Sequence, residues 1–200
     1  AIAGSHGKTT TTSLVGSIFS QSGFDPTIIN GGVINSLSKN NRLGKSDWMI
    51  VEADESDGSF LRLPHQINII TNIDIEHWDF YKSKKNLLLA FEKFVNNLPF
   101  YGYSIMCIDN INLRNLYKTI KTRKIITYSR NQNSDIRVKF IQRNPNNTKF
   151  SLFIKKGTFK KIEGNYNFTT TLLGDHNILN ATGSIAASLI ANVPINQIRK

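Results

Sequence analysis

The sequence predicts an α/β fold: a mostly parallel sheet of the phosphate-loop type, flanked by helices, with a small antiparallel β patch. Two patterns carry this prediction. Short apolar runs alternate along the chain with segments whose apolar residues recur at helical spacing, which is typical of a parallel sheet with crossover helices. From about residue 136 to 173, apolar and polar residues instead alternate singly, as they do in half-exposed antiparallel strands.

The chain begins with a phosphate-binding pattern. The apolar Ala1-Ile2-Ala3 reads as the end of a strand, and Gly4-Ser5-His6-Gly7-Lys8-Thr9-Thr10 follows directly before a helix-like stretch. Backbone N–H groups of such a turn, together with the positive end of the helix dipole, favour phosphate oxygens. Lys8 is expected to reach the β- and γ-phosphates, and Thr9 to hold Mg²⁺. The pattern is shortened, and Gly4 supplies its turn.

The remaining elements follow in order. Helical spacing runs from Thr9 to Ser22, and Gly23 is a typical helix stop. Apolar runs rich in β-branched residues predict strands at Thr27–Ile29, Trp48–Glu52, Ile67–Thr71, Ser104–Ile108 and Lys124–Tyr128. Helical spacing predicts helices at Leu87–Asn97, Ile111–Thr119 and Ile178–Ala191, and a further helical turn after Pro194. Single alternation, interrupted by turn residues, predicts the antiparallel patch at 136–142, 149–154 and 167–173.

Composition narrows the class of protein. The net charge is +11, but the lysines are scattered through Lys-, Asn- and Ile-rich segments without the aromatic–basic alternation that stacks bases. A compositional bias is therefore favoured over a nucleic-acid surface, which is the weakest alternative. No apolar run is long enough to span a membrane, and no signal peptide is recognisable. The single cysteine, Cys107, lies in an apolar run and is expected to be a buried thiol in a reducing compartment.

An acidic cluster follows the predicted strand that ends near residue 52. Glu52-Ala53-Asp54-Glu55-Ser56-Asp57 places four carboxylates within six residues, and such a set repels itself unless a cation is present. Glu52, at the strand end, is the expected Mg²⁺ ligand opposite Thr9. The alternative for the later acidic residues is a solvated turn, with helix caps at Ser56 or Asp57.

Two further polar clusters also stand where strands or turns end. In Thr71-Asn72-Ile73-Asp74-Ile75-Glu76-His77, the histidine is a candidate metal ligand, and the nearby carboxylates can orient it. The alternative is an ordinary hydrogen-bonded or exposed histidine. Asn177 and Asn180 lie three residues apart at a helix start, so their amides share one face and suit the edge of a purine. The equal alternative is helix capping by Asp175 or Asn177.

Together the four clusters resemble the central, ATP-binding domain of the Mur ligases, which form amide bonds in bacterial peptidoglycan precursor synthesis. The matching runs occur in the family's order and cover essentially the whole chain. Two positions depart from the family pattern: Ser5 stands where threonine is usual, and Glu76 precedes the histidine where aspartate is common. Several sister ligases carry a carbamylated lysine after the histidine. Lys93 is the nearest lysine here, and that role stays unassigned. Segments 54–61, 97–102 and 31–44 most resemble the members that use L-alanine.

The resemblance implies a reaction. ATP phosphorylates the lactyl carboxylate of UDP-N-acetylmuramate, L-alanine attacks the acyl phosphate, and ADP and phosphate are released. Lys8, Glu52 and His77 are then the catalytic residues. Thr9 and Glu52 hold one Mg²⁺ and His77 a second, whereas residues 4–10 bind the phosphates of ATP. His176, Asn177 and Asn180 contact the adenine side.

The resemblance also implies a domain arrangement. Residues 1–200 correspond to the central domain, and the domains that grip the uridine and the amino acid lie before and after it in the family. We expect both to be absent from this chain, so that the fragment alone is inactive. The resemblance also implies a location in the bacterial cytoplasm, where the family works. Two alternatives remain open: a related ligase that adds a peptide to UDP-N-acetylmuramate, for which tyrosine is expected at Ser56, and a non-ligase phosphate-loop NTPase. Preference for L-alanine over glycine or serine is not decided by the sequence.

Overall fold

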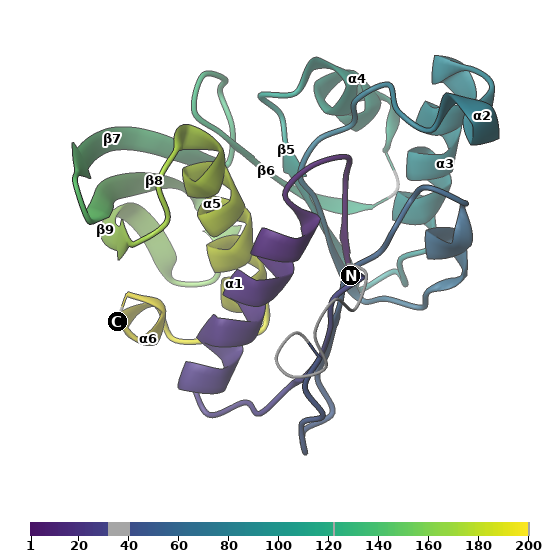
Figure 1. Ribbon diagram of the computed structural model, residues 1–200. Coiled ribbons are helices and arrows are strands. Elements are labelled where there is room, and N and C mark those ends of the chain that lie inside the picture. Colours follow the sequence, from purple (N-terminus) through teal and green to yellow (C-terminus); the bar gives the residue numbers. More distant parts are fainter. Residues whose placement is uncertain (32–40, 122, 200) are drawn as a thin grey trace.

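The computed structural model describes residues 1–31, 41–121 and 123–199 of the 200-residue chain (Figure 1). Most of segment 31–44, whose sequence resembles the alanine-adding ligases, therefore lies outside the described residues. In the part of the chain that the structure describes, no helix combines the length and apolar character that a bilayer span requires.

A seven-stranded sheet forms the centre of the fold, in the order β1-β4-β5-β6-β7-β8-β9. The pairs from β1 to β7 are parallel, and β7, β8 and β9 are antiparallel neighbours. A separate parallel pair, β2 and β3, adjoins β1 through a bridge between Ile2 and Glu52, so β1 lies between β3 and β4. The strands are β1 (Ile2–Ala3), β2 (Thr27–Ile29), β3 (Met49–Val51), β4 (Ile67–Ile70), β5 (Tyr103–Cys107), β6 (Lys124–Ser129), β7 (Ile136–Asn144), β8 (Asn147–Phe159) and β9 (Ile162–Thr170).

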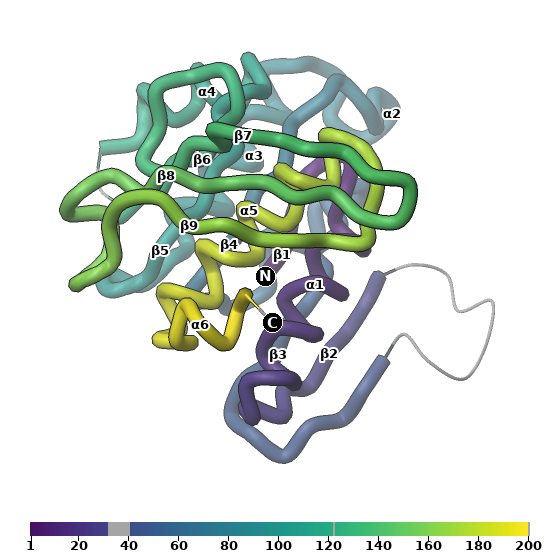
Figure 2. The backbone as a smooth tube through the Cα atoms, turned by 90° about the vertical axis from the view of Figure 1, so that its left-hand side faces the viewer, coloured from purple at the N-terminus to yellow at the C-terminus, as the bar shows by residue number. Residues whose placement is uncertain are grey.

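Helices cover both faces of the parallel strands. Figure 1 shows α1 (Lys8–Gln21) and α5 (Asp175–Ile190) packed together on one side, with α3 (Lys84–Asn96) and α4 (Ile111–Thr119) on the other. Helix α5 is rich in alanine, serine and glycine and is buried from Ala181 to Leu189, so it can approach α1 and the sheet closely. Short helices complete the fold: a 3₁₀ turn (Ser59–Arg62), α2 (Trp78–Tyr81) and α6 (Ile195–Ile198). In Figure 2 the strands β7, β8 and β9 lie side by side next to α5.

The predicted α/β class and the order of its elements are confirmed. Helices α3 and α5 begin three residues earlier than their apolar spacing predicted, because caps and turns set a helix start; for α3 the Ser83 hydroxyl accepts the N–H of Asn86. The prediction of a strand at 167–173 is wrong at both ends, since β9 spans Ile162–Thr170 and Leu173 is exposed in the turn before α5. Neither α2 nor the 3₁₀ turn was predicted, because both are too short to show a periodic pattern of apolar residues.

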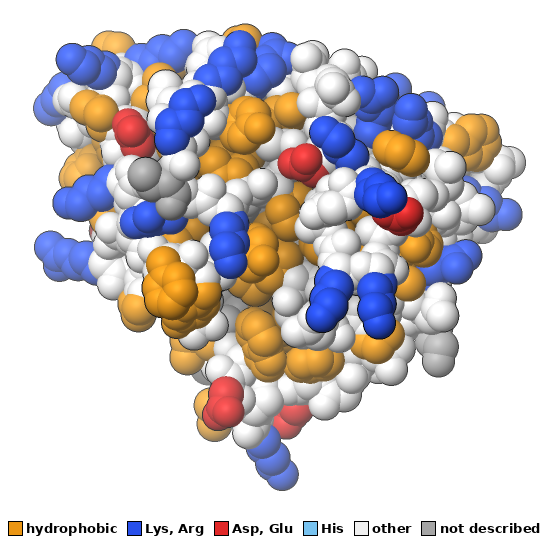
Figure 3. Space-filling model, turned by 180° about the vertical axis from the view of Figure 1, so that it is seen from behind, with side chains coloured by type: hydrophobic (Ala, Val, Ile, Leu, Met, Phe, Trp, Pro, Cys, Tyr) orange, Lys and Arg blue, Asp and Glu red, His pale blue; other side chains and the backbone are white. Residues whose placement is uncertain are grey.

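Two compositional predictions can be compared with the structure. Cys107 is buried, and burial raises the pKa of its thiol to about 12, so it is an unreactive thiol. On the face that Figure 3 shows, Lys and Arg side chains lie dispersed between polar and apolar ones, without gathering into a single stripe. On this face, the dispersal fits a compositional bias better than a continuous path for a nucleic-acid backbone.

Candidate nucleotide and metal site

Three polar segments meet at the carboxyl ends of neighbouring parallel strands. The phosphate loop follows β1, the acidic segment 52–57 follows β3, and the histidine loop 71–77 follows β4. Because β3, β1 and β4 are adjacent, their carboxyl ends bring these segments together. This edge is where open α/β sheets bind ligands.

The backbone of the phosphate loop requires glycine at two positions. Gly4 has φ +130°, and a Cβ there would lie 2.2 Å from the Thr71 hydroxyl oxygen. Gly7 has φ +84°, and a Cβ there would lie 2.7 Å from the side-chain oxygen of Asn180. Helix α1 starts directly afterwards at Lys8. The loop is thus pressed between the β4 loop and α5, as expected for a turn that presents backbone groups to a ligand.

Lys8 forms an ion pair with a buried carboxylate. Its ammonium group is 2.9 Å from an oxygen of Glu55 and also donates to the Gly4 carbonyl at 2.8 Å. The side chain of Glu55 is only 1% exposed and that of Lys8 only 14%. The Tyr81 hydroxyl donates to the Glu55 carbonyl, and burial raises the pKa of Tyr81 to about 12. The catalytic candidate Lys8 is therefore held inside the site rather than extended into solvent.

Thr9 and Glu52 meet as the sequence predicted. The Thr9 hydroxyl donates to one oxygen of Glu52 at 3.1 Å, and the second oxygen accepts the N–H of Gly31 at 3.0 Å. Hydroxyl and carboxylate oxygens at this spacing are suitable ligands for Mg²⁺. Their role as ligands stays a prediction.

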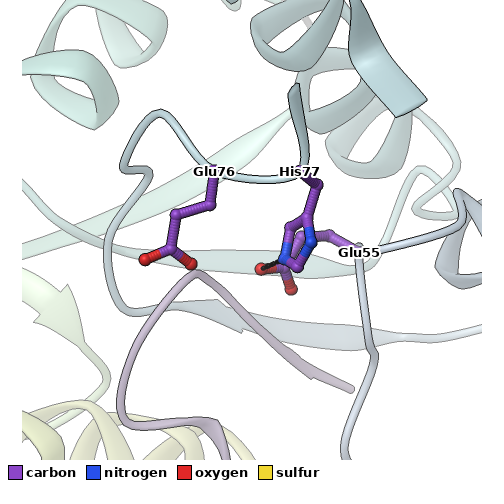
Figure 4. A group of neighbouring side chains, drawn as sticks. All are labelled: Glu55, Glu76 and His77. Atoms are coloured by element: carbon purple, nitrogen blue, oxygen red, sulfur yellow. Dashed lines mark ion pairs between the residues drawn. The ribbon is translucent and has the colours of Figure 1, made fainter. Parts of the chain in front are cut away.

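A second group of metal-binding side chains contains Glu55, Glu76 and His77 (Figure 4). One ligand atom of each lies within 4.8 Å of the others, and the His77 Nε2 is 3.6 Å from Oε1 of Glu55. That Glu55 oxygen is buried without a hydrogen-bond partner in the described chain. A buried carboxylate oxygen without a partner is costly, and a cation is the group that would satisfy it. His77 itself is a third exposed and has φ +54° at the start of α2.

Sequence reasoning named Glu55 only as one acid among four, and the structure distinguishes them. Asp54 and Asp57 are exposed and accept the backbone N–H groups of Ser56 and Ser59, as the solvated-turn alternative predicted. The helix caps that it placed at Ser56 or Asp57 are wrong, because Gly58 is the N-cap of the 3₁₀ turn. The hydrogen bonds from Ser59 lower the pKa of Asp57. Glu55 alone of the four is buried. No spacing rule identifies the buried member, because the segment is an irregular turn without a period.

The start of α5 lies beside the phosphate loop. Asn180 is buried, and its amide donates to the Asn177 side-chain oxygen at 3.2 Å, so the two amides share one face as predicted. The capping alternative is wrong: the N-cap is Gly174, and no side chain caps this helix. His176 is exposed, as is Lys93 on α3.

Asp175, at the start of α5, forms ion pairs with Arg130 and Arg143. The hydrogen bond from Arg143 is the main cause that lowers the pKa of the Asp175 carboxyl.

Comparison with known proteins agrees with this geometry. The sequence pattern of the family described as the Mur ligase middle domain matches residues 2–188. A UDP-N-acetylmuramate–L-alanine ligase from Methylocella silvestris is 46% identical over 202 residues, which cover 100% of this chain and 42% of that protein. Among solved structures, the UDP-N-acetylmuramate–alanine ligase from Thermotoga maritima has a TM-score of 0.82 at 22% identity and covers 99% of this chain and 42% of its own.

A MurF ligase of Thermotoga maritima, solved in complex with ADP, shares the fold with a TM-score of 0.75 at 13% identity, covering 100% of this chain and 47% of its own. The chain thus spans less than half the length of each of these three proteins. Its sequence match over nearly all residues, and the phosphate-loop geometry described above, point to one family. The chain therefore belongs to the Mur ligase family, whose middle-domain pattern it matches over residues 2–188.

Proposed function

We propose that residues 1–200 are the ATP-binding middle domain of a bacterial ligase that joins L-alanine to UDP-N-acetylmuramate, with release of ADP and phosphate. The observation that carries the proposal is the buried Glu55 carboxylate, which lies between the phosphate-loop lysine and His77 and has one oxygen that accepts no hydrogen bond from the described residues. The sequence relatives named for this reaction support the choice of substrates. Phosphoryl transfer from ATP to a carboxylate needs such a convergence of positive charge and metal ligands.

The chemistry begins with a carboxylate, which is a poor electrophile because its charge repels nucleophiles. Transfer of the γ-phosphoryl group to the lactyl carboxylate creates a leaving group, and the amine of L-alanine then displaces phosphate. Lys8 would neutralise charge on the β- and γ-phosphates. The N–H groups of Ser5 and His6 donate to Asn72, so phosphate binding would fall to the first turn of α1, whose N–H groups lack partners within the helix.

The donor sets fit Mg²⁺. Thr9 and Glu52 would hold one ion, and Glu55, Glu76 and His77 would hold the second, with carboxylate oxygens as the main ligands. When bound, the ions would screen the repulsion between the triphosphate and the acceptor carboxylate. Glu55 already has one oxygen free of hydrogen bonds, which is the condition a metal ligand must meet.

His176, Asn177 and Asn180 would contact the adenine side of ATP. Asn180 also lies against Gly7, so the same helix would position both the base and the phosphate loop. Because the chain spans about 42% of its relatives' length, the groups that grip uridine and L-alanine would belong to N-terminal and C-terminal domains of the same protein. The isolated domain would then not complete the reaction, which would take place in the bacterial cytoplasm.

The proposal is tested by phosphate release from the full-length protein supplied with ATP, Mg²⁺ and UDP-N-acetylmuramate. L-Alanine, glycine, L-serine and a short peptide are compared as the second substrate. We expect release to require both substrates and to be fastest with L-alanine. Release with the peptide as second substrate, but with none of the three amino acids, would establish the peptide-adding alternative. Release from ATP without UDP-N-acetylmuramate and without a second substrate would establish a plain NTPase.

A further inference from the structure

Hydrogen bonds to the backbone of His6 join the phosphate loop to the histidine loop. The N–H of His6 donates to the side-chain oxygen of Asn72 at 2.8 Å. The His6 carbonyl accepts from the Thr71 hydroxyl at 2.7 Å and from the Asn72 amide at 2.9 Å. One residue further back, the Ser5 hydroxyl accepts the N–H of Asp74 at 2.8 Å. The two loops therefore form one unit, and His6 lies at its centre.

The side chain of His6 extends this connection to two carboxylates. Its Nε2 is 3.3 Å from an oxygen of Asp74 and 3.3 Å from an oxygen of Glu76. Asp74 has another partner, since its second oxygen accepts from the Asn110 amide at 3.1 Å. Within the described ranges of the chain, His6 is the one side chain that the structure pairs with the carboxylate of Glu76. The side chain of His6 is 62% exposed and that of Glu76 39% exposed, and this is the contact available to orient Glu76.

The orientation of Glu76 matters because this residue belongs to the candidate metal group. A carboxylate oxygen of Glu76 lies within 4.8 Å of the ligand atoms of Glu55 and His77 (Figure 4). A free glutamate side chain loses rotamer entropy when it is ordered on a metal, and a close polar contact that restricts the side chain beforehand reduces this cost. His6 also lies between Asp74 and Glu76, so one ring nitrogen is close to both carboxylates and can hold them in a fixed relation to each other.

We propose that His6 is a positioning residue that holds the carboxylate of Glu76 in the metal group and fixes this group relative to the phosphate loop. The proposal deepens the function proposed above and rests on it. His6 then acts through Glu76 and not by touching phosphate: its backbone N–H is taken by Asn72, and its imidazole is directed at carboxylates. This role is separate from the phosphate-binding role that the sequence pattern assigns to the loop.

The test measures Mn²⁺ binding to the full-length protein by electron paramagnetic resonance of the free ion, with ADP binding and thermal midpoint measured alongside. The Glu55→Gln variant serves as the reference, because its loss of Mn²⁺ binding shows how much of the binding depends on the group of Glu55, Glu76 and His77. We expect His6→Ala to weaken Mn²⁺ binding about tenfold, at the low end of the effect of residues that orient metal ligands. His6→Gln, which keeps an N–H donor close to the position of Nε2, should bind Mn²⁺ within about twofold of the parent protein.

A double-mutant cycle decides whether His6 acts through Glu76. The double variant His6→Ala/Glu76→Gln should bind Mn²⁺ no more weakly than Glu76→Gln alone, because the two residues share one effect. The same cycle with the exposed, remote Glu163→Gln should be additive and serves as the matched control.

Three results would overturn the positioning role. In the first, the His6 and Glu76 effects on Mn²⁺ add. In the second, His6→Ala weakens ADP binding and leaves Mn²⁺ binding unchanged, as a phosphate contact requires. In the third, ADP affinity, Mn²⁺ affinity and thermal midpoint fall together and His6→Gln does not restore them, as a purely structural residue requires. Mn²⁺ binding does not depend on the ligase reaction. The double-mutant cycle can therefore support the role of His6 even if phosphate release does not depend on alanine, and the latter result would count against the proposed function alone.

Discussion

Replacement of Lys8 by alanine should have two separable consequences, because the residue serves both phosphate chemistry and a buried ion pair. In the full-length protein we expect turnover to fall roughly a hundredfold or more, as for other donors that stabilise transition-state charge. A hundredfold loss corresponds to about 2.7 kcal/mol of activation free energy. The assay is phosphate release at saturating substrates, and near-normal release would remove the phosphate-loop assignment.

The structure adds a cost in stability that the motif alone does not predict. Lys8→Ala leaves the Glu55 carboxylate 1% exposed and without its partner at 2.9 Å. Breaking a fully buried pair costs about 3–5 kcal/mol, and the partial exposure of Lys8 together with the nearby His77 brings the expected loss to about 2–3 kcal/mol. For a domain of this size, that loss lowers the thermal midpoint by about 4–12 °C.

A second substitution checks the cause of this loss. Lys8→Ala/Glu55→Gln removes both charges, so calorimetry should show a midpoint above that of Lys8→Ala, while turnover stays low. The matched remote change, Glu163→Gln combined with Lys8→Ala, should recover nothing. A double variant as unstable as the single one would refute the account of Glu55 as a buried, charge-dependent partner of Lys8.

Three further expectations follow from the site. His77→Ala in the full-length protein should depress acyl-phosphate formation, trapped with hydroxylamine, far more than ATP binding, since Thr9 and Glu52 still hold one ion; unchanged trapping would exclude the metal role. Calorimetry on residues 1–200 should show ATP binding that exceeds GTP binding, and equal binding would exclude the adenine role of Asn177 and Asn180. Asp175→Asn should lower the thermal midpoint at pH 7, and this difference should disappear as the pH falls below about 4. The arginine hydrogen bonds lower the folded-state pKa of Asp175, so their stabilisation is lost once the carboxyl is protonated. A difference that does not depend on pH would contradict this.

Much of the fold could be predicted from local patterns, because each pattern reports a burial period or a backbone requirement. Alternation of apolar runs identified the parallel strands, and the glycines of the phosphate loop marked a turn whose backbone excludes a Cβ. The sequence also predicted that Thr9 and Glu52 would meet, since the phosphate loop and the acidic cluster each follow the end of a strand. That these two strands, β1 and β3, are neighbours was shown by the structure. Helix starts were less predictable, because Ser83 and Gly174 act through turn geometry that carries no period.

The sequence by itself determined the α/β class, the phosphate loop and the edge of the sheet at which the polar clusters gather. Only the tertiary structure decided which acid of the cluster is buried beside Lys8, and that His6 faces Asp74 and Glu76. The physical reason is that both choices are made in irregular loops. There, the positions of side chains and backbone depend on hydrogen bonds to residues more than forty positions away, and no local spacing encodes such a partner. Examples are the Glu55 carboxylate with Lys8 and the His6 backbone N–H with Asn72.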